Sequence, residues 1–113
     1  MLVGVSIRQG TAVVSSMTYG GQSLTVVKTR CRVNACTEIW SLVNPQVGKN
    51  NVTINLSASN PVIGAVNTFF NVHQTEPLRR RNMNVAGAST GSPTVTVTSS
   101  PGDLVFDAVT CDD

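Results

Sequence analysis

The stretch Val52-Thr53-Ile54-Asn55-Leu56-Ser57 decides the fold class, because apolar and polar residues alternate in it without exception. Successive side chains of a β-strand point to opposite faces, so the apolar set faces a core and the polar set faces water. The same alternation returns in Thr94-Val95-Thr96-Val97-Thr98. Both stretches therefore predict β-strands with one wet face.

Further strand-like runs lie outward from this stretch, separated by turn residues. Gly20-Gly21-Gln22 is typical of a hairpin turn with positive φ, and Asn44-Pro45 and Ser59-Asn60-Pro61 end the runs before them. Residues 73–93 form a long irregular connection, with a short strand expected around Met83–Ala86. The predicted strands are Leu2–Ile7, Ala12–Tyr19, Ser23–Arg30, Thr37–Val43, Val52–Ser57, Val62–Val72, Thr94–Thr98 and Asp103–Thr110.

The run Val62–Val72 is the longest apolar segment, and its length would also suit a helix. Its β-branched residues, the Asn-Pro before it and Gly64 inside it favour a strand with a bend or bulge.

Composition points the same way. The chain has 113 residues, of which 41% are hydrophobic, 4% aromatic and 12% charged, against a usual charged share of about 25%. We expect an all-β fold, a single antiparallel β-sandwich in the immunoglobulin-like to jelly-roll range with about seven or eight strands, forming one module over residues 1–113. The predicted core comprises Val3, Val5, Val14, Trp40, Leu42, Ile54, Leu56, Val66, Phe70, Val97, Leu104 and Phe106.

The net charge of +2 is too small to hold a polyanion, so nucleic acid is not an expected partner. Arg79, Arg80 and Arg81 form a cationic cluster, which is either a solvated loop or a ligand contact. The last segment carries Asp107, Asp112 and Asp113, without the spaced acidic loop of a calcium site. We expect no metal and no cofactor.

Three cysteines leave at least one thiol unpaired within one chain. Cys31 and Cys36 bracket four residues between two strand-like runs, so they can form a disulfide in an oxidising compartment. Cys111 is then a small packing residue or an exposed group able to link two chains. Three reduced packing cysteines are the alternative.

Met1 runs directly into the first predicted strand without a secretory signal, and no run reaches the length of a membrane span. The abrupt strand-like ends suggest a module cut from a longer protein, with truncation at the C-terminus as one possibility.

Several strings together resemble a known group of modules: Val13 to Thr25 (VVSSMTYGGQSLT), Glu38 to Pro45 (EIWSLVNP), Gly64 to Val66 (GAV), Val72 to Leu78 (VHQTEPL) and Pro101 to Asp107 (PGDLVFD). In this order they are similar to the β-sandwich modules of large bacterial surface and secreted proteins. The resemblance implies an extracellular or cell-surface location, and it carries no catalytic motif to transfer. Two departures are the arginine cluster after Leu78 and the early end at Asp113, from which we expect a truncated module with an edge strand left unpaired.

Few residues offer chemistry. His73 is the only histidine, and we expect it at a strand end making local hydrogen bonds. Glu38 and Glu76 are the only glutamates, and nothing in the sequence brings them together as a glycosidase pair. Tyr19 and Trp40 are the rings available for stacking on a ligand, although a tryptophan in a strand is more often a core residue. The candidate ligand-binding residues are Tyr19, Trp40, His73, Arg79, Arg80 and Arg81.

We expect a non-enzymatic structural or adhesive module. The alternatives are a carbohydrate-binding module and a small glycan-acting enzyme. Expected partners are a glycan or another surface protein, without membrane insertion. An exposed sheet edge at the apolar final segment also predicts a homo-oligomer formed by strand addition or exchange.

Overall fold

The structure is a computed structural model that describes residues 1–8, 10, 12–79 and 94–111. Over these residues the chain forms seven strands and no helix. The strands are β1 (Leu2–Arg8), β2 (Val14–Tyr19), β3 (Gln22–Ser23), β4 (Thr25–Arg32), β5 (Ala35–Ser41), β6 (Val52–Leu56) and β7 (Val62–Asn67).

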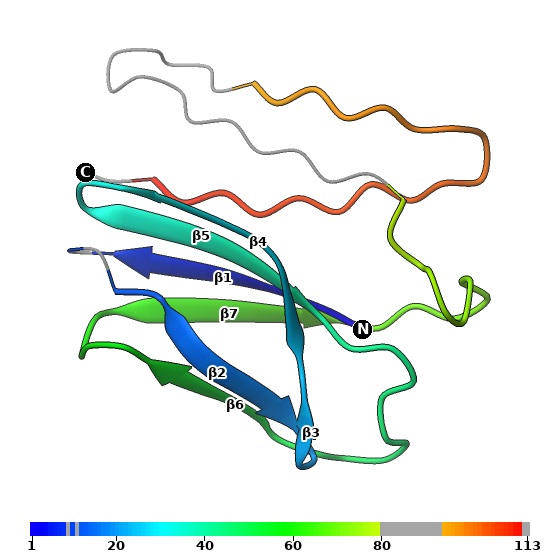
Figure 1. The fold of residues 1–113 in the computed structure, drawn as a ribbon, viewed down its shortest axis with the longest axis horizontal. Helices are drawn as coiled ribbons and strands as arrows, with labels where there is room; N and C mark the ends of the chain where they lie inside the picture. The colour runs from blue at the N-terminus through cyan, green and yellow to red at the C-terminus, as the bar shows by residue number, and fades with distance from the viewer. Residues whose placement is uncertain (9, 11, 80–93, 112–113) are drawn as a thin grey trace.

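The strands form two antiparallel sheets that stack face to face (Figure 1). The four-stranded sheet has the order β4-β5-β1-β7, and the three-stranded sheet has the order β3-β2-β6. The predicted all-β antiparallel sandwich is therefore confirmed. The hairpin at Gly20 and Gly21 is also confirmed, since both glycines have positive φ, at 54° and 84°.

The core lies between the two sheets, and every second side chain of β1 and β5 points into it. Val3, Val5 and Ile7 of β1 are at most 1% exposed. Directly opposite them on β5 stand Trp40, Glu38 and Cys36, which are also buried. The three-stranded sheet adds Val14 and Met17, with a register shift between Val14 and Ser16. Burial of each such apolar side chain stabilises the fold by about 1.5–3 kcal/mol.

The predicted core is confirmed in part. Val3, Val5, Val14 and Trp40 are buried, and Leu42, Ile54 and Leu56 are half-buried against the core. Val97 and Phe106 are half-buried but do not pack against this core, so their inclusion was wrong. Val66, Phe70 and Leu104 were wrongly included, because they are 46%, 88% and 70% exposed. Alternation shows that a strand has an apolar face, but it does not show whether another sheet covers that face.

The predicted strand Val62–Val72 ends at Asn67, as β7, and residues after it leave the sheet. Thr94–Thr98 and Asp103–Thr110 form no strand at all, so these two predictions are wrong. Both segments run nearly straight beside the sandwich, in orange and red (Figure 1). Their sequences suit strands, but neither segment is hydrogen-bonded into a sheet ladder. The strand expected around Met83–Ala86 lies outside the described residues.

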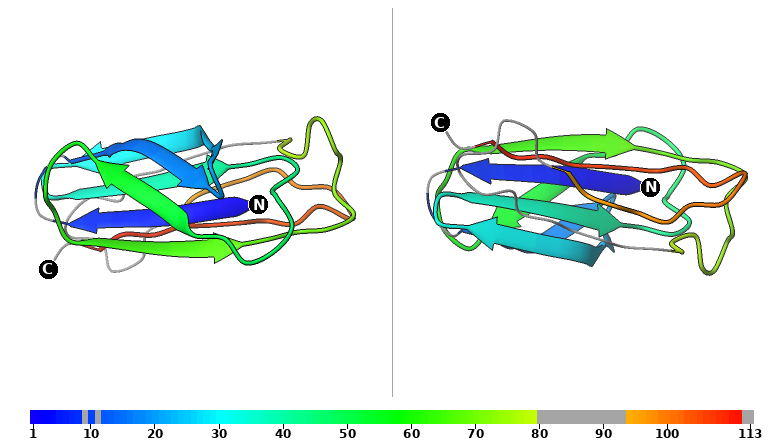
Figure 2. Two further views of the ribbon diagram at one scale, coloured as in Figure 1. Left: turned by 90° about the horizontal axis from the view of Figure 1, so that it is seen from below. Right: turned by 90° about the horizontal axis from the view of Figure 1, so that it is seen from above.

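The segment Asp103–Thr110, called the outer segment below, covers the face of the four-stranded sheet that points away from the core (Figure 2). Gly4 of β1 makes this contact possible, because a Cβ atom there would lie 3.2 Å from the Cβ of Ala108 and 3.5 Å from the Phe106 ring. Phe106 also makes an edge-to-face contact with Phe69, with ring centroids 6.5 Å apart. The hydroxyl of Thr110 forms a 2.6 Å hydrogen bond with that of Thr37 on β5.

Replacing Gly4 with valine should displace the outer segment while the sandwich keeps its cooperative unfolding transition. The valine side chain would overlap Ala108 and Phe106 but would not enter the core, since Gly4 faces away from it. Chymotryptic cleavage after Phe106, followed by mass spectrometry, should become several-fold faster.

Ala58→Val is the matched control, because Ala58 is exposed in the turn between β6 and β7. Equal cleavage rates in Gly4→Val and Ala58→Val would show that Gly4 does not hold the outer segment.

Candidate functional site

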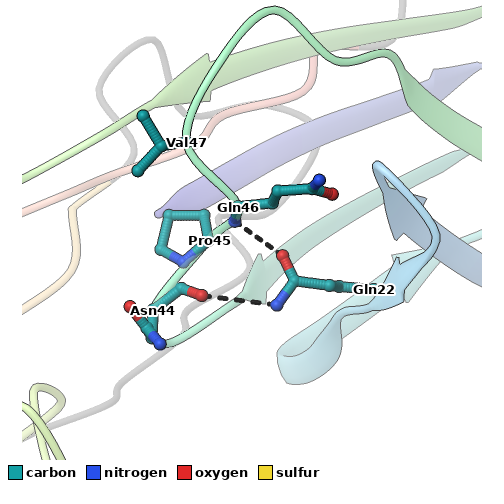
Figure 3. A pocket seen from close by; sticks show the side chains of 5 residues that line it. All are labelled: Gln22, Asn44, Pro45, Gln46 and Val47. Carbon is teal, nitrogen blue, oxygen red and sulfur yellow. Dashed lines mark hydrogen bonds between the residues drawn. The ribbon is translucent and has the colours of Figure 1, made fainter.

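The side chain of Gln22 makes two of the hydrogen bonds that hold the loops together at one end of the sandwich. Gln22 of β3 donates from Nε2 to the carbonyl of Asn44 at 3.3 Å, and its Oε1 accepts from the N–H of Gln46 at 2.6 Å (Figure 3). Its amide thereby fixes the connection between β5 and β6 against the hairpin of β2 and β3. Asn44 adopts a positive φ of 52° in this connection, a conformation that asparagine tolerates better than most residues.

Tyr19, the first candidate ligand-binding residue, also holds the connection between β5 and β6. Its hydroxyl donates to the carbonyl of Gly48 at 3.1 Å, and the next N–H, of Gly20, donates to the carbonyl of Asn51 at 3.3 Å. The ring is half-buried and packs against the core. Tyr19 therefore anchors the connection between β5 and β6 to the sandwich.

Two shallow hollows open beside these loops. The first has a volume of about 500 Å³ and is lined by Gln22, Asn44, Pro45, Gln46 and Val47 (Figure 3). Val47 is 96% exposed, so this hollow presents an exposed aliphatic side chain beside Pro45 and three side-chain amides. The second has a volume of about 420 Å³ and is lined by Ser41, Val43, Thr75, Glu76, Pro77 and Leu78.

Trp40 does not serve as a stacking platform, which corrects its place among the candidate ligand-binding residues. It is 8% exposed, and its indole N–H donates to Oε2 of Glu38 at 2.7 Å. Both faces of the ring lie in the core, so no ligand can reach it.

Glu38 is the one buried charged residue among the described residues, at 1% exposed. Its Oε1 accepts from the backbone N–H of Val14 at 2.9 Å, while Oε2 accepts from Trp40. Glu38 belongs to β5 in one sheet and Val14 to β2 in the other, so this carboxylate joins the two sheets. Sequence reasoning missed this role, although the alternation Cys36, Glu38, Trp40 could have placed the glutamate on the core face.

His73 lies six residues beyond the end of β7, not at a strand end as predicted. Its Nδ1 accepts from the N–H of Glu76 at 3.0 Å and from the N–H of Thr75 at 3.4 Å. The expected local hydrogen bonds are therefore present, and they hold a turn in the exposed segment after β7. An accepting Nδ1 carries no proton.

Arg79 is engaged by an aspartate of the outer segment. Its Nη1 lies 3.0 Å and 3.2 Å from the two carboxylate oxygens of Asp103. Asp103 also accepts from the N–H of Ser100 at 2.8 Å, closing the turn around Pro101 and Gly102. That backbone hydrogen bond, with the Arg79 guanidinium as a further cause, lowers the pKa of Asp103 although partial desolvation opposes it. Arg80 and Arg81 lie outside the described residues.

Cys31 and Cys36 form a disulfide between directly opposed residues of β4 and β5, with Cα atoms 4.1 Å apart. The disulfide links the two strands of the β4–β5 hairpin. Of the two alternatives given by the sequence, a disulfide or reduced cysteines, the structure has the disulfide. Cys111 is exposed with a free thiol.

The six candidate ligand-binding residues do not form one site. Among the described ones, no hydrogen bond or ion pair joins any two of Tyr19, Trp40, His73 and Arg79, and each uses its polar group to hold backbone or another side chain. Within the described ranges no group of three or more His, Cys, Asp or Glu residues could hold a metal ion. The same ranges contain no helix with the length and apolarity to cross a membrane.

Replacing Glu38 with alanine should lower the free energy of unfolding by about 2–4 kcal/mol, because two buried donors lose their acceptor and each unsatisfied donor costs about 1–3 kcal/mol. Glu38→Gln keeps one accepting oxygen and should fall between alanine and the native residue. Urea denaturation followed by fluorescence of Trp40, the only tryptophan, measures the loss directly.

Glu76→Ala is the control for Glu38→Ala, since Glu76 is exposed and its side chain makes no hydrogen bond within the described residues. It should change stability by less than about 0.5 kcal/mol. Equal stability of the Glu38 and Glu76 variants would contradict the role assigned to Glu38.

The turn at Asp103 should loosen as the pH falls. A carboxyl whose pKa is lower in the folded chain than in the unfolded chain stabilises the fold above its unfolded pKa, and this contribution disappears as the pH drops through the folded pKa. Carboxyl NMR should give Asp103 a midpoint below the usual value for an aspartate. Arg79→Gln should raise that midpoint only in part, because the Ser100 N–H remains. A midpoint at or above the usual value would contradict the assignment.

Comparisons of the chain with protein-family models, with curated proteins and with solved structures found no match.

Proposed function

We propose that the chain is a non-enzymatic structural or adhesive β-sandwich module of a bacterial surface or secreted protein. One observation carries the proposal: among the described residues, the polar side chains that suggested chemistry at Glu38, His73 and Arg79 hold the scaffold instead. Glu38 joins the sheets, His73 holds a turn, and Arg79 and Asp103 pair with each other. What remains exposed is strand edge, apolar surface and loops, which suits contact with another macromolecule.

Two observations support the proposed location outside the cell or on its surface. The disulfide between Cys31 and Cys36 suits an oxidising environment such as the cell exterior. The strings that resemble surface modules supply the bacterial origin. These strings follow one another in order from Val13 to Asp107.

The placement of Glu38, one of the chain's two glutamates, disfavours a glycan-acting enzyme. A glycosidase needs two carboxyl groups facing one substrate. Glu38 is buried, and both of its oxygens already accept hydrogen bonds from Val14 and Trp40. Glu76 would have to act without it.

Carbohydrate binding is a second candidate, favoured by the hollow at Gln22, Asn44 and Gln46. Side-chain amides suit sugar hydroxyl groups because they both donate and accept. Against this, the Gln22 amide already holds Asn44 and Gln46, and the apolar lining residues are Pro45 and Val47, neither of which is an aromatic ring.

The proposal is tested with beads that carry the chain and surfaces coated with bacterial envelope material. We expect the beads to adhere, and we expect protease treatment of the surface to abolish adhesion, because the proposed ligand is a protein. Periodate treatment, which destroys sugar diols, should leave adhesion intact. Uncoated beads serve as the control.

The alternatives give opposite results in the same experiments. Adhesion that periodate abolishes, together with binding on a glycan array, would replace the proposal with carbohydrate binding. Turnover of glycosides by the native chain that disappears in Glu76→Gln would establish the enzyme.

A further inference from the structure

The strand β4 forms one edge of the four-stranded sheet. It pairs with β5 on one side only, from Thr25 to Arg32, in a register that shifts between Val26 and Lys28. An edge strand exposes a row of backbone donors and acceptors, which another extended segment can join.

Three cations follow each other at alternate positions of this edge strand. Lys28, Arg30 and Arg32 are all exposed, and their partners on β5 are Ile39, Thr37 and Ala35. These partners lie on the face away from the core, because Cys36, Glu38 and Trp40 point into it. The cations therefore form one row, called the cationic strip below, on the outer face of the sheet.

Two cations of the strip are free to bind a partner. No ion pair or hydrogen bond engages the side chains of Lys28 and Arg30 within the described part of the chain. Arg32 takes part in an interaction within its own chain, and the inference does not depend on it. Lys28 and Arg30 lie two residues apart on the same face and repel each other, so an acidic segment laid beside them would relieve that repulsion.

The chain itself contains an acidic extended segment. Four of its six acidic residues, namely Asp103, Asp107, Asp112 and Asp113, fall within the last eleven positions. Residues 104–110 make no backbone–backbone hydrogen bond with other described residues, and the Ala108 N–H donates instead to Oδ1 of Asp107 at 2.8 Å. The other backbone groups of this segment can therefore join a ladder. The outer segment is eight residues long, which equals the length of β4.

Three of the four acidic residues, like the cations of the strip, lie an even number of positions apart and so share one face of an extended strand. Side chains of a strand alternate between faces, so odd-numbered residues of the C-terminal segment share one face when it is extended. Asp103, Asp107 and Asp113 are all odd-numbered. In a ladder with β4, this whole set can lie on the outer face, which is the face that carries Lys28 and Arg30.

We propose that the β4 edge accepts the acidic C-terminal segment, residues 103–113, of a second copy of the chain as an added strand. The inference rests on the proposed adhesive function and supplies its partner. Each copy then offers one acceptor edge and one donor segment, so the contact is head-to-tail and propagates into open chains of modules.

The donor segment is held in its own chain by few contacts. They are the packing of Phe106 and Ala108 against Gly4 and Phe69, the hydrogen bonds of Thr110, and the Asp103 pair with Arg79. Strand addition would replace water on its backbone groups with a ladder, which compensates for the contacts that are lost.

A peptide of residues 101–113 with serine at position 111 tests the contact directly. We expect it to bind the full chain carrying Cys111→Ser, in fluorescence anisotropy at low salt, and to weaken as salt rises. Lys28→Glu should raise the dissociation constant about tenfold, because an attraction becomes a repulsion. Lys49→Glu makes the same charge change on an exposed loop lysine and should leave the constant within about twofold.

A second peptide separates strand addition from simple charge attraction. N-methylation of alternate backbone nitrogens of the peptide keeps its charge but removes ladder donors, so it should abolish binding in at least one of the two alternate patterns. Equal binding of methylated and native peptides, or equal effects of Lys28→Glu and Lys49→Glu, would overturn the proposal.

The intact chain gives the third readout. Sedimentation equilibrium of the Cys111→Ser chain should show a mass that grows with concentration, and Lys28→Glu should reduce it to the monomer. A monomer at every concentration would mean that the acidic end stays with its own chain, and it would overturn the inference. Bead adhesion to protein surfaces that survives such a result would leave the adhesive function standing.

Discussion

The carboxylate of Glu38 is the constraint on which the rest of the structure depends. A buried charge is costly unless its oxygens accept strong hydrogen bonds, and these come from two places at once: the Val14 N–H of one sheet and the Trp40 indole of the other. The carboxylate therefore fixes the distance and register between the sheets. Val14 begins β2 beside a register shift, which turns its N–H out of the ladder toward the glutamate.

The four-stranded sheet has two different faces, and their difference follows from the period of two. The inner face of β1 and β5 is sealed by the three-stranded sheet, with side chains that are almost fully buried. The outer face is covered in part by a segment without ladder bonds, which packs into the space that Gly4 leaves and hydrogen-bonds to β5 through Thr110. The same face carries the cationic strip of β4. The core thus makes the scaffold rigid, while the outer face keeps the groups that can interact with other molecules.

The polar residues that suggested chemistry mostly serve architecture. Gln22 and Tyr19 clasp the loop between β5 and β6, and His73 and Asp103 close turns through backbone N–H groups. Such loops are short of regular ladder bonds, so side chains must satisfy the backbone groups there. A module built in this way presents stable loops and edges to a partner without offering a reactive cleft, in keeping with the proposed adhesive function.

The sequence by itself determined the fold class, the hairpin at Gly20 and Gly21, and the inner faces of the first strands. These depend on local alternation and turn chemistry, which are legible in a single chain. Only the tertiary structure decided which apolar faces are covered. Thr94–Thr98 alternates as regularly as Val52–Ser57, yet it stays outside both sheets, and Phe70 remains exposed. It also decided the role of Glu38, because the two donors that satisfy a buried carboxylate come from positions 24 residues and 2 residues away. A ladder or a buried charge needs a partner that is distant along the chain, and local pattern does not specify which partner folding will bring.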